Sequence, residues 1–170
     1  MNRYLFVIDY QNDFVDGALG FPGAEKLDEK IAAKVRAYGK GHVLFTRDTH
    51  FENYLDTREG KNLPVKHCIK GSFGWEVYGE TAKALAEVEA PAIDKLVFGM
   101  DVTDPATAAV LPESADEIEL VGLVSNICVV SNAVIPDVAS WVLPHCEAPR
   151  FPGALLVRTR CPDTSPNSTL

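Results

Sequence analysis

The stretch IELVGLVSNICVV, residues 118–130, joins an apolar run to a turn and then to a cysteine. Residues 118–121 predict a short buried strand, and the side-chain oxygens of Ser125 and Asn126 suit the start of a helix. Cys128 would lie in the first turn of that helix, where unpaired N–H groups and the helix dipole favour a thiolate. Free cysteine is also among the most buried residue types. On this stretch alone, a core thiol is therefore more common than a nucleophile.

Helices and strands are expected to alternate along the chain. Residues 4–8 (YLFVI) form a continuous apolar run, which is typical of a central parallel strand buried on both faces. The alternation predicts an α/β fold, a doubly wound, Rossmann-like parallel sheet flanked by helices. Apolar runs and helical spacing predict further strands at residues 42–46, 92–98 and 118–121, and helices at residues 24–38, 76–88 and 106–111.

Composition excludes several classes of protein. The formal net charge of −8 and the pI near 4.9 argue against a nucleic-acid-binding surface, which relies on clustered Lys and Arg. Residues 1–9 are too short and too soon interrupted for a signal peptide, and no stretch approaches the ~20 apolar residues of a membrane span. The four cysteines, at irregular positions, do not resemble a disulfide framework. We therefore expect a cytoplasmic protein without nucleic-acid or membrane partners.

Polar residues with catalytic or ligand chemistry follow the predicted strands. Asp9 ends the first strand, where ligands bind in open α/β sheets, with a turn-forming Asp as the alternative. Asp48, His50 and His67 form a plausible set of three ligands for a divalent cation, with solvated or structural histidines as the alternative. Lys95 stands in an apolar run. Because burying an unpaired ammonium is costly, it needs either an edge position or a carboxylate partner.

Four motifs carry a resemblance to the isochorismatase-like cysteine hydrolases, and within them to the nicotinamidases. Residues 7–14 (VIDYQNDF) resemble the opening motif of the family, and residues 122–129 (GLVSNICV) resemble its nucleophile motif. Residues 48–50 (DTH) with His67 look like the nicotinamidase metal site, and Lys95 stands where the family has its catalytic lysine. Each motif is modest alone, but all four in this order and spacing are specific.

The resemblance implies a set of site residues. Asp9, Lys95 and Cys128 would be catalytic, with Cys128 as the nucleophile. The Leu123–Val124 peptide bond would be cis, and the backbone N–H groups of Val124 and Cys128 would hold the oxyanion. The implied oxyanion and substrate-binding residues are Val124, Ser125 and Phe14, and the implied metal ligands are Asp48, His50 and His67, joined in some members by Glu59, directly or through water.

The activity implied by the resemblance is hydrolysis of nicotinamide to nicotinate and ammonia through a thioester on Cys128. A divalent metal ion, expected to be zinc, would bind the pyridine nitrogen and orient the substrate. Two alternatives remain: a family hydrolase of another small amide or of isochorismate, and an inactive family member with a damaged C-terminal part. The expected partner is a small-molecule amide, and a homo-oligomer is left open.

The sequence changes character after residue 135. Six of the eleven prolines follow this point, and lysine is absent after Lys95. The family resemblance covers roughly residues 3–135, so we expect a hydrolase core at residues 1–135 and an atypical or truncated segment at residues 136–170. One hypothesis is that this segment is a frameshifted reading of an ordinary family member. Within it, strands are expected at residues 139–143 and 153–157, and disorder at residues 160–170.

Overall fold

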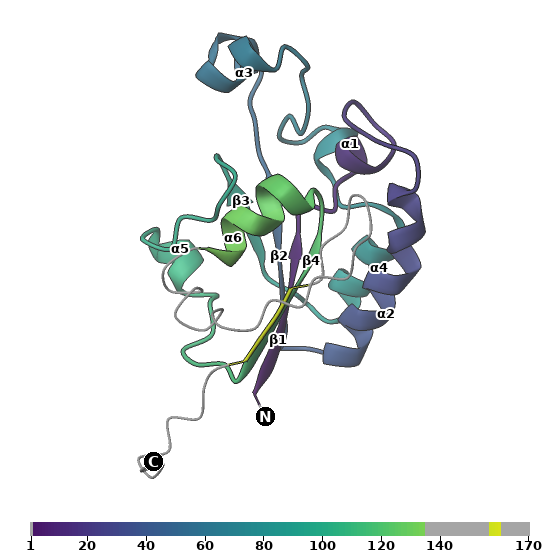
Figure 1. The fold of residues 1–170 in the computed structure, drawn as a ribbon, viewed down its shortest axis with the longest axis vertical. Coiled ribbons are helices and arrows are strands. Elements are labelled where there is room, and N and C mark those ends of the chain that lie inside the picture. The colour runs from purple at the N-terminus through teal and green to yellow at the C-terminus, as the bar shows by residue number, and fades with distance from the viewer. Residues whose placement is uncertain (1, 135–156, 161–170) are drawn as a thin grey trace, which may run out of the picture.

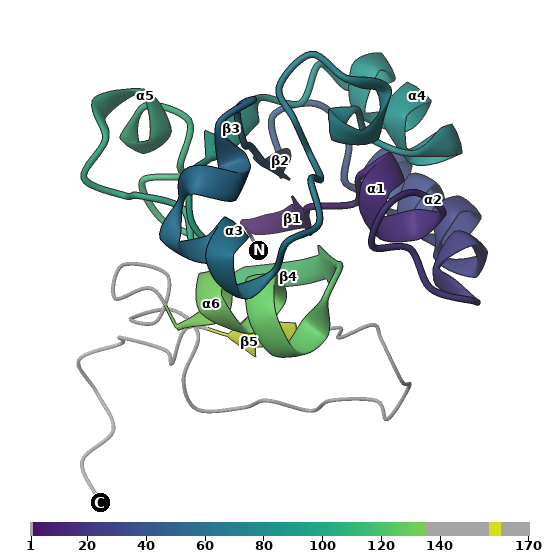
Figure 2. The same ribbon diagram turned by 90° about the horizontal axis from the view of Figure 1, so that it is seen from above.

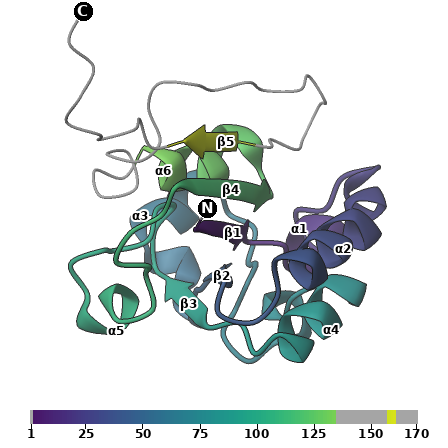
Figure 3. The same cartoon turned by 90° about the horizontal axis from the view of Figure 1, so that it is seen from below.

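A five-stranded sheet forms the centre of the protein in the computed structural model, which describes residues 2–134 and 157–160 (Figure 1). Its strands are β1 (Arg3–Ile8), β2 (Val43–Asp48), β3 (Ala92–Lys95), β4 (Glu117–Gly122) and β5 (Val157–Arg160). They lie in the order β3-β2-β1-β4-β5. The first four are parallel, and β5 runs antiparallel to β4 beside it (Figure 3). The predicted parallel α/β sheet is confirmed, with a fifth, antiparallel strand in addition.

The sheet separates two hydrophobic cores. Because side chains alternate along a strand, Leu5 and Val7 of β1 face one core while Phe6 and Ile8 face the other. All four side chains are at most 1% exposed, which explains the continuous apolar run in the sequence. The helices on the first face are α2 (Asp28–Tyr38) and α4 (Gly79–Glu87), and those on the second are α5 (Pro105–Ala108) and α6 (Val130–Ala133) (Figure 2).

Short helices punctuate the loops that follow β1 and β2. Thr57 and Ser72 each begin one of them by accepting a hydrogen bond from the backbone N–H of Gly60 and Trp75, respectively. Such short turns carry no apolar periodicity, which is why the sequence pattern indicated irregular structure after β2. They are the α-helices α1 (Asn12–Val15) and α3 (Arg58–Asn62) and the 3₁₀-helices η1 (Ala24–Leu27), η2 (Tyr54–Asp56) and η3 (Phe73–Trp75).

Four predicted elements are shorter than expected. The helix expected at residues 24–38 divides into η1 and α2, and α2 begins only at Asp28. β3 ends at Lys95 rather than at residue 98, because its neighbour β2 ends at Asp48, which pairs with Lys95. The helix expected at residues 106–111 is limited to α5, whose first turn is capped by Asp104. The helix expected at residues 76–88 begins only with α4, at Gly79.

The helix after β4 departs from its prediction at its first turn. It begins with a π-helical turn, η4 (Ser125–Val129), before continuing as α6. The N-cap is Val124, without a side-chain cap hydrogen bond, so the expected capping by Ser125 and Asn126 is wrong. The carbonyl of Val124 instead accepts hydrogen bonds from the N–H groups of Ile127 and Val129, which closes the wider turn.

Most of the C-terminal segment, residues 136–170, lies outside the described residues. Val157 begins β5, so only the last position of the strand expected at residues 153–157 falls within the structure, and Arg160 ends β5. The disorder expected from residue 160 is wrong at Arg160 itself, which pairs within the sheet. The strand expected at residues 139–143, the rest of the expected disorder, the core boundary at residue 135 and the cytoplasmic location stay predictions. Within the part of the chain that the structure describes, no helix has the length and apolar character that a membrane crossing needs.

Candidate active site and metal centre

Four polar side chains meet where the parallel strands end. Asp9 follows β1, Asp48 ends β2, Lys95 ends β3, and Cys128 lies in η4 directly after β4. Parallel strands bring their carboxyl ends to one edge of a sheet, so residues far apart in the sequence become neighbours there (Figure 2). Each of the four is at most 5% exposed. This edge of the sheet is the candidate site.

Asp9 is held by residues of β2 and β3, the two strands that lie on one side of β1 in the sheet. Its backbone lies in the left-handed region, with φ of 48°, which turns the chain sharply at the end of β1. Thr46 Oγ1 donates a hydrogen bond of 2.6 Å to Asp9 Oδ1, and Lys95 Nζ lies 2.7 Å from Asp9 Oδ2. Burial raises the pKa of the Asp9 carboxyl, and the positive charge of Lys95 opposes that rise. The result is a buried ion pair at the centre of the site.

Burial and neighbouring charges raise the pKa of the Cys128 thiol above its ordinary value. Burial raises the pKa of the thiol, and the negative charge of Asp9 and its hydrogen bond with the thiol raise it further, while Lys95 lowers it. This direction is opposite to the one expected from the helix start, and the expectation of a thiolate stays a prediction. A nucleophilic Cys128 needs a base during attack, and Asp9 is the carboxylate beside it.

Gly122 allows β4 and η4 to approach the end of β1. Its φ is 137°, and a Cβ atom at this position would lie 1.9 Å from the carbonyl oxygen of Ile8. The N–H of Leu123 donates a hydrogen bond of 3.0 Å to the same oxygen. The Leu123–Val124 peptide bond is cis, as the resemblance implied. This turn places Cys128 over the end of β1, next to Asp9.

Asp48, His50 and His67 form a buried cluster beside the ion pair. Asp48 Oδ2 lies 3.1 Å from His50 Nε2 and 3.5 Å from His67 Nε2, and one ligand atom of each residue falls within 4.8 Å of the others. Burial alone would raise the pKa of Asp48, but the two imidazoles and Lys95 hold it well below its usual range. Glu59 Oε1 lies 3.8 Å from His50 Nε2, at the outer edge of the cluster.

The donor atoms of this cluster fit a divalent cation such as zinc. His50 Nε2 is buried and has no hydrogen bond of good geometry, although Asp48 Oδ2 lies 3.1 Å away, and a cation bound between these atoms would satisfy both. His67 Nδ1 lies 2.8 Å from the carbonyl oxygen of Val65, which can only accept, so the neutral ring carries its proton there. Its Nε2 lone pair is then free to bind a metal, and fixing the ring through its second nitrogen is usual for metal-binding histidines.

Comparison with known proteins decides the family. The model of the isochorismatase domain matches residues 3–143. The chain belongs to the isochorismatase family. The resemblance to the isochorismatase-like cysteine hydrolases is thereby confirmed, and with it the expectation of a hydrolase. A search of curated proteins found no match to this family member.

Solved structures of other members have the same fold. The nicotinamidase/pyrazinamidase of Bacillus subtilis is 27% identical, with a TM-score of 0.67 over 79% of this chain and 78% of that one. The pyrazinamidase/nicotinamidase of Streptococcus mutans is 29% identical, with a TM-score of 0.67 over 78% and 77%. The pyrazinamidase of Pyrococcus horikoshii, solved in complex with zinc, is 23% identical, with a TM-score of 0.59 over 79% and 77%, and shows similarity of fold alone.

The remaining implied residues of this isochorismatase-family chain also lie at the site. Phe14 is buried, with its ring 5.7 Å from the ring of His67. Val124 and Ser125 form the turn immediately before Cys128 and are partly buried. The structure thus brings every implied catalytic, substrate-binding and metal-ligating residue to one edge of the sheet. Their roles in catalysis stay predictions.

Gln11 was not singled out in the sequence, although it lies inside the opening motif. Its buried side chain accepts a hydrogen bond of 2.7 Å from the N–H of Asp48 and donates one of 2.9 Å to the carbonyl of Asp48. It also donates a bond of 2.9 Å to the carbonyl of Trp75. Gln11 therefore fixes the backbone of a candidate metal ligand. Its partners are distant in sequence, and no local pattern indicates them.

Asp13 fixes the segment that carries His67. Its Oδ2 accepts a hydrogen bond of 2.7 Å from the backbone N–H of Cys68, the residue after His67. A Cβ atom at Gly74 would lie 2.1 Å from the same oxygen. The absence of a side chain at residue 74 therefore leaves room for the Asp13 carboxylate.

The substitution Gly74→Ala should weaken metal binding. The new methyl group displaces the Asp13 carboxylate, releases the N–H of Cys68 and loosens His67, and loss of such outer-shell support costs about 10-fold in metal affinity. Zinc titration of the folded variant measures the effect. Ser72→Ala is the control, because it removes the N-cap of the same 3₁₀ turn without entering the space of Asp13. Equal zinc affinity in the two variants would contradict the explanation.

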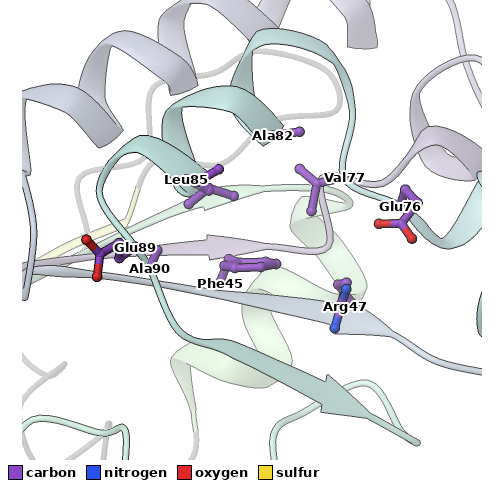
Figure 4. A pocket seen from close by; sticks show the side chains of 9 residues that line it. Phe45, Arg47, Glu76, Val77, Ala82, Leu85, Glu89 and Ala90 are labelled. Atoms are coloured by element: carbon purple, nitrogen blue, oxygen red, sulfur yellow. The ribbon is translucent and has the colours of Figure 1, made fainter.

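A cavity of about 330 Å³ lies elsewhere, between α4 and β2 (Figure 4). One charged residue in its wall is Arg47, whose guanidinium makes a 2.8 Å ion pair with Asp94 and stacks 3.7 Å from the centre of the Trp75 ring. It contains none of the implied site residues, so we place the active site at the sheet edge. Its lining residues are Phe45, Arg47, Glu76, Val77, Ala82, Leu85, Ala86, Glu89 and Ala90.

Proposed function

We propose that the protein is a metal-dependent cysteine amidohydrolase that cleaves nicotinamide to nicotinate and ammonia. One observation carries the proposal: a buried Asp–Lys–Cys group and a buried Asp–His–His group share the same edge of the sheet. The two groups touch, because Lys95 Nζ lies 3.9 Å from Asp48 Oδ1. The nicotinamidases of Bacillus subtilis and Streptococcus mutans, which share this fold at 27% and 29% identity, support the choice of substrate.

In the first half of the proposed reaction, Cys128 forms a thioester. The sulfur attacks the carboxamide carbon while its proton passes to Asp9. The ammonium group of Lys95 stabilises the Asp9 carboxylate before the proton transfer and the developing Cys128 thiolate during it. The N–H groups of Val124 and Cys128 bind the oxyanion. Asp9 then returns the proton to the amide nitrogen, the C–N bond breaks, and ammonia leaves.

In the second half, water releases the acid. Asp9, again a carboxylate, takes a proton from a water molecule whose oxygen attacks the thioester carbon. The C–S bond breaks, the sulfur of Cys128 takes up the proton, and nicotinate leaves. Both halves use the same base and nucleophile, so the resting protonation state of Cys128 is restored at the end of each cycle.

The proposal assigns a divalent cation to Asp48, His50 and His67, with Glu59 as an additional ligand. When bound, the ion supplies a positive centre that attracts the ring nitrogen of nicotinamide and orients the carboxamide toward Cys128. Phe14 would flank the pyridine ring from beside His67. Two imidazole nitrogens and one carboxylate are a ligand set that suits zinc, which supports zinc as the metal.

Nicotinamide and benzamide together test this function, because they differ only in the ring nitrogen. We expect zinc-loaded protein to release ammonia from nicotinamide and far less from benzamide. Removing the metal with a chelator should bring the nicotinamide rate down to the background, and added zinc should restore it. Absence of ammonia release by folded, zinc-loaded protein would sink the proposed reaction. Equal rates on the two amides would sink the role of the ring nitrogen.

A further inference from the structure

Asn132 uses its whole side chain to join two parts of the site. It is fully buried on α6, one helical turn after Cys128. Its Nδ2 donates hydrogen bonds of 2.8 Å to the carbonyl of Cys128 and 3.1 Å to the carbonyl of Phe98. Its Oδ1 accepts a bond of 2.9 Å from the N–H of Met100. The side chain thus ties the helix that carries the nucleophile to the segment that follows β3.

The bond to Cys128 alone would have a local explanation. Small polar side chains in helices commonly bond the carbonyl one turn earlier. The bonds to Phe98 and Met100 are different, because these residues lie 34 and 32 positions away. In the described residues, no other buried polar side chain hydrogen-bonds both the Cys128 helix and the segment after β3. The geometry needs two N–H donors and one acceptor on a neutral group, which a side-chain amide provides.

The segment held by Asn132 supplies one of the contacts of the Lys95 ammonium group, the carbonyl of Val97. Lys95 Nζ donates a hydrogen bond of 3.2 Å to the carbonyl of Val97 and pairs with Asp9 at 2.7 Å. Side-chain packing contributes little to the position of Val97, because the exposed fractions of Leu96, Val97 and Phe98 are 62%, 62% and 46%. The hydrogen bonds of Asn132, with the buried Met100, therefore fix the carbonyl that holds the ammonium group.

We propose that Asn132 is a positioning residue that fixes the position of the Lys95 ammonium group relative to the thiol of Cys128. The inference rests on the proposed function for the roles of these two residues. Without Asn132, the Val97 carbonyl and the first turn of the Cys128 helix are no longer fixed to each other. The charge that stabilises the thiolate during attack is then misplaced, although substrate and metal still bind.

Two substitutions test the proposal. Asn132→Asp keeps the size and the acceptor for Met100 but presents an oxygen, in place of the Nδ2 donor, to two carbonyls. Asn132→Ala removes all three hydrogen bonds. The matched control is Asp28→Asn, a buried exchange of acid and amide that weakens three hydrogen bonds to Glu80 and Thr81 between α2 and α4, away from the site.

The kinetic parameters separate positioning from general destabilisation. We expect kcat for nicotinamide to fall about 10- to 100-fold in both Asn132 variants, because small misplacements of reacting groups have effects of that size. KM and bound zinc should stay unchanged, and Asp28→Asn should keep the wild-type kcat. Unchanged kcat in folded Asn132 variants, or an equal loss in Asp28→Asn, would overturn the proposal.

Alkylation of Cys128 by iodoacetamide gives a second readout that does not depend on turnover. If the unchanged protein does not hydrolyse nicotinamide, the proposed function fails, and this measurement still decides the role of Asn132. A misplaced Lys95 stabilises the thiolate less, so the alkylation rate at a fixed pH should fall about 10-fold in both variants. A faster rate, as simple loosening of the helix would give, or an unchanged rate would overturn the inference. The modified peptide is identified by mass spectrometry.

Discussion

Cys128→Ser should abolish hydrolysis of nicotinamide and leave the fold and the metal content intact. Serine has nearly the same shape as cysteine, and the side chain at residue 128 is 5% exposed, so packing changes little. The hydroxyl is a much weaker acid than the thiol, and a base as weak as Asp9 cannot remove its proton efficiently. Loss of a nucleophile in a catalytic group typically lowers kcat by at least about 10⁴-fold. Ammonia release under saturating nicotinamide measures the loss.

The covalent intermediate gives this prediction its sharpest test. Acid quenching during turnover should trap a nicotinoyl adduct on the peptide that contains Cys128, and the adduct should be absent from Cys128→Ser. Cys161→Ser serves as the reagent control, because it also exchanges one cysteine for serine but lies outside the nucleophile motif. Measurable turnover in Cys128→Ser or Cys128→Ala would falsify the thioester mechanism.

Lys95→Met should both inactivate and destabilise the protein. Methionine matches the length and apolar stem of lysine but lacks the ammonium, so it leaves the buried Asp9 carboxylate without its partner at 2.7 Å. Removing one member of a buried ion pair costs about 3–5 kcal/mol in the free energy of unfolding. Urea unfolding at neutral pH measures the cost, and ammonia release should be absent because neither anion of the reaction is stabilised.

The double variant Asp9→Asn/Lys95→Met distinguishes charge from packing. Removing both charges leaves no uncompensated ion, so most of the stability lost in Lys95→Met should return while activity stays absent. A double variant as unstable as Lys95→Met would show that packing of the lysine stem, rather than the unpaired charge, caused the loss.

The free energy of unfolding of Lys95→Met should fall as the pH rises above the ordinary pKa range of aspartate. Without the cation that opposed it, burial raises the pKa of Asp9 further above its unfolded value. Because the folded state then binds the Asp9 proton more tightly than the unfolded state does, protonation stabilises the fold. This stabilisation is complete at pH values below the pKa of aspartate in the unfolded chain. The stabilisation is lost as the pH rises through the raised pKa of the folded state. Urea unfolding of the variant should therefore show falling stability above the ordinary range of aspartate.

Sequence patterns predicted the elements that depend on local signals. The structure contains β1, α2 and α4 where their patterns predicted them. A strand buried on both faces needs consecutive apolar residues, and a helix buried along one stripe needs apolar residues at helical spacing. The same holds for Asp9 and Asp48, which directly follow or end strands. Lys95 combines both explanations offered for it, since it lies on the edge strand β3 and still pairs with Asp9.

Other features depend on partners that no local pattern reveals. Thr46, Gln11 and Asn132 are buried polar residues whose hydrogen bonds reach 32 to 64 positions along the chain. A single sequence shows such residues as ordinary polar positions in a strand, loop or helix. The raised pKa of the Cys128 thiol has no local signal either, because it depends on burial by the completed fold, whereas the helix start alone indicated the opposite direction.

The central place of β1 in the sheet has a consequence for biosynthesis. Arg3 of β1 pairs in register with Glu117 of β4, 114 positions later. A growing chain therefore keeps one hydrogen-bonding edge of its first strand open until β4 has left the ribosome, and open strand edges can pair with other chains. Cys128 follows β4 almost at once. The nascent chain thus closes this edge of β1 and acquires its proposed nucleophile in the same short interval of synthesis.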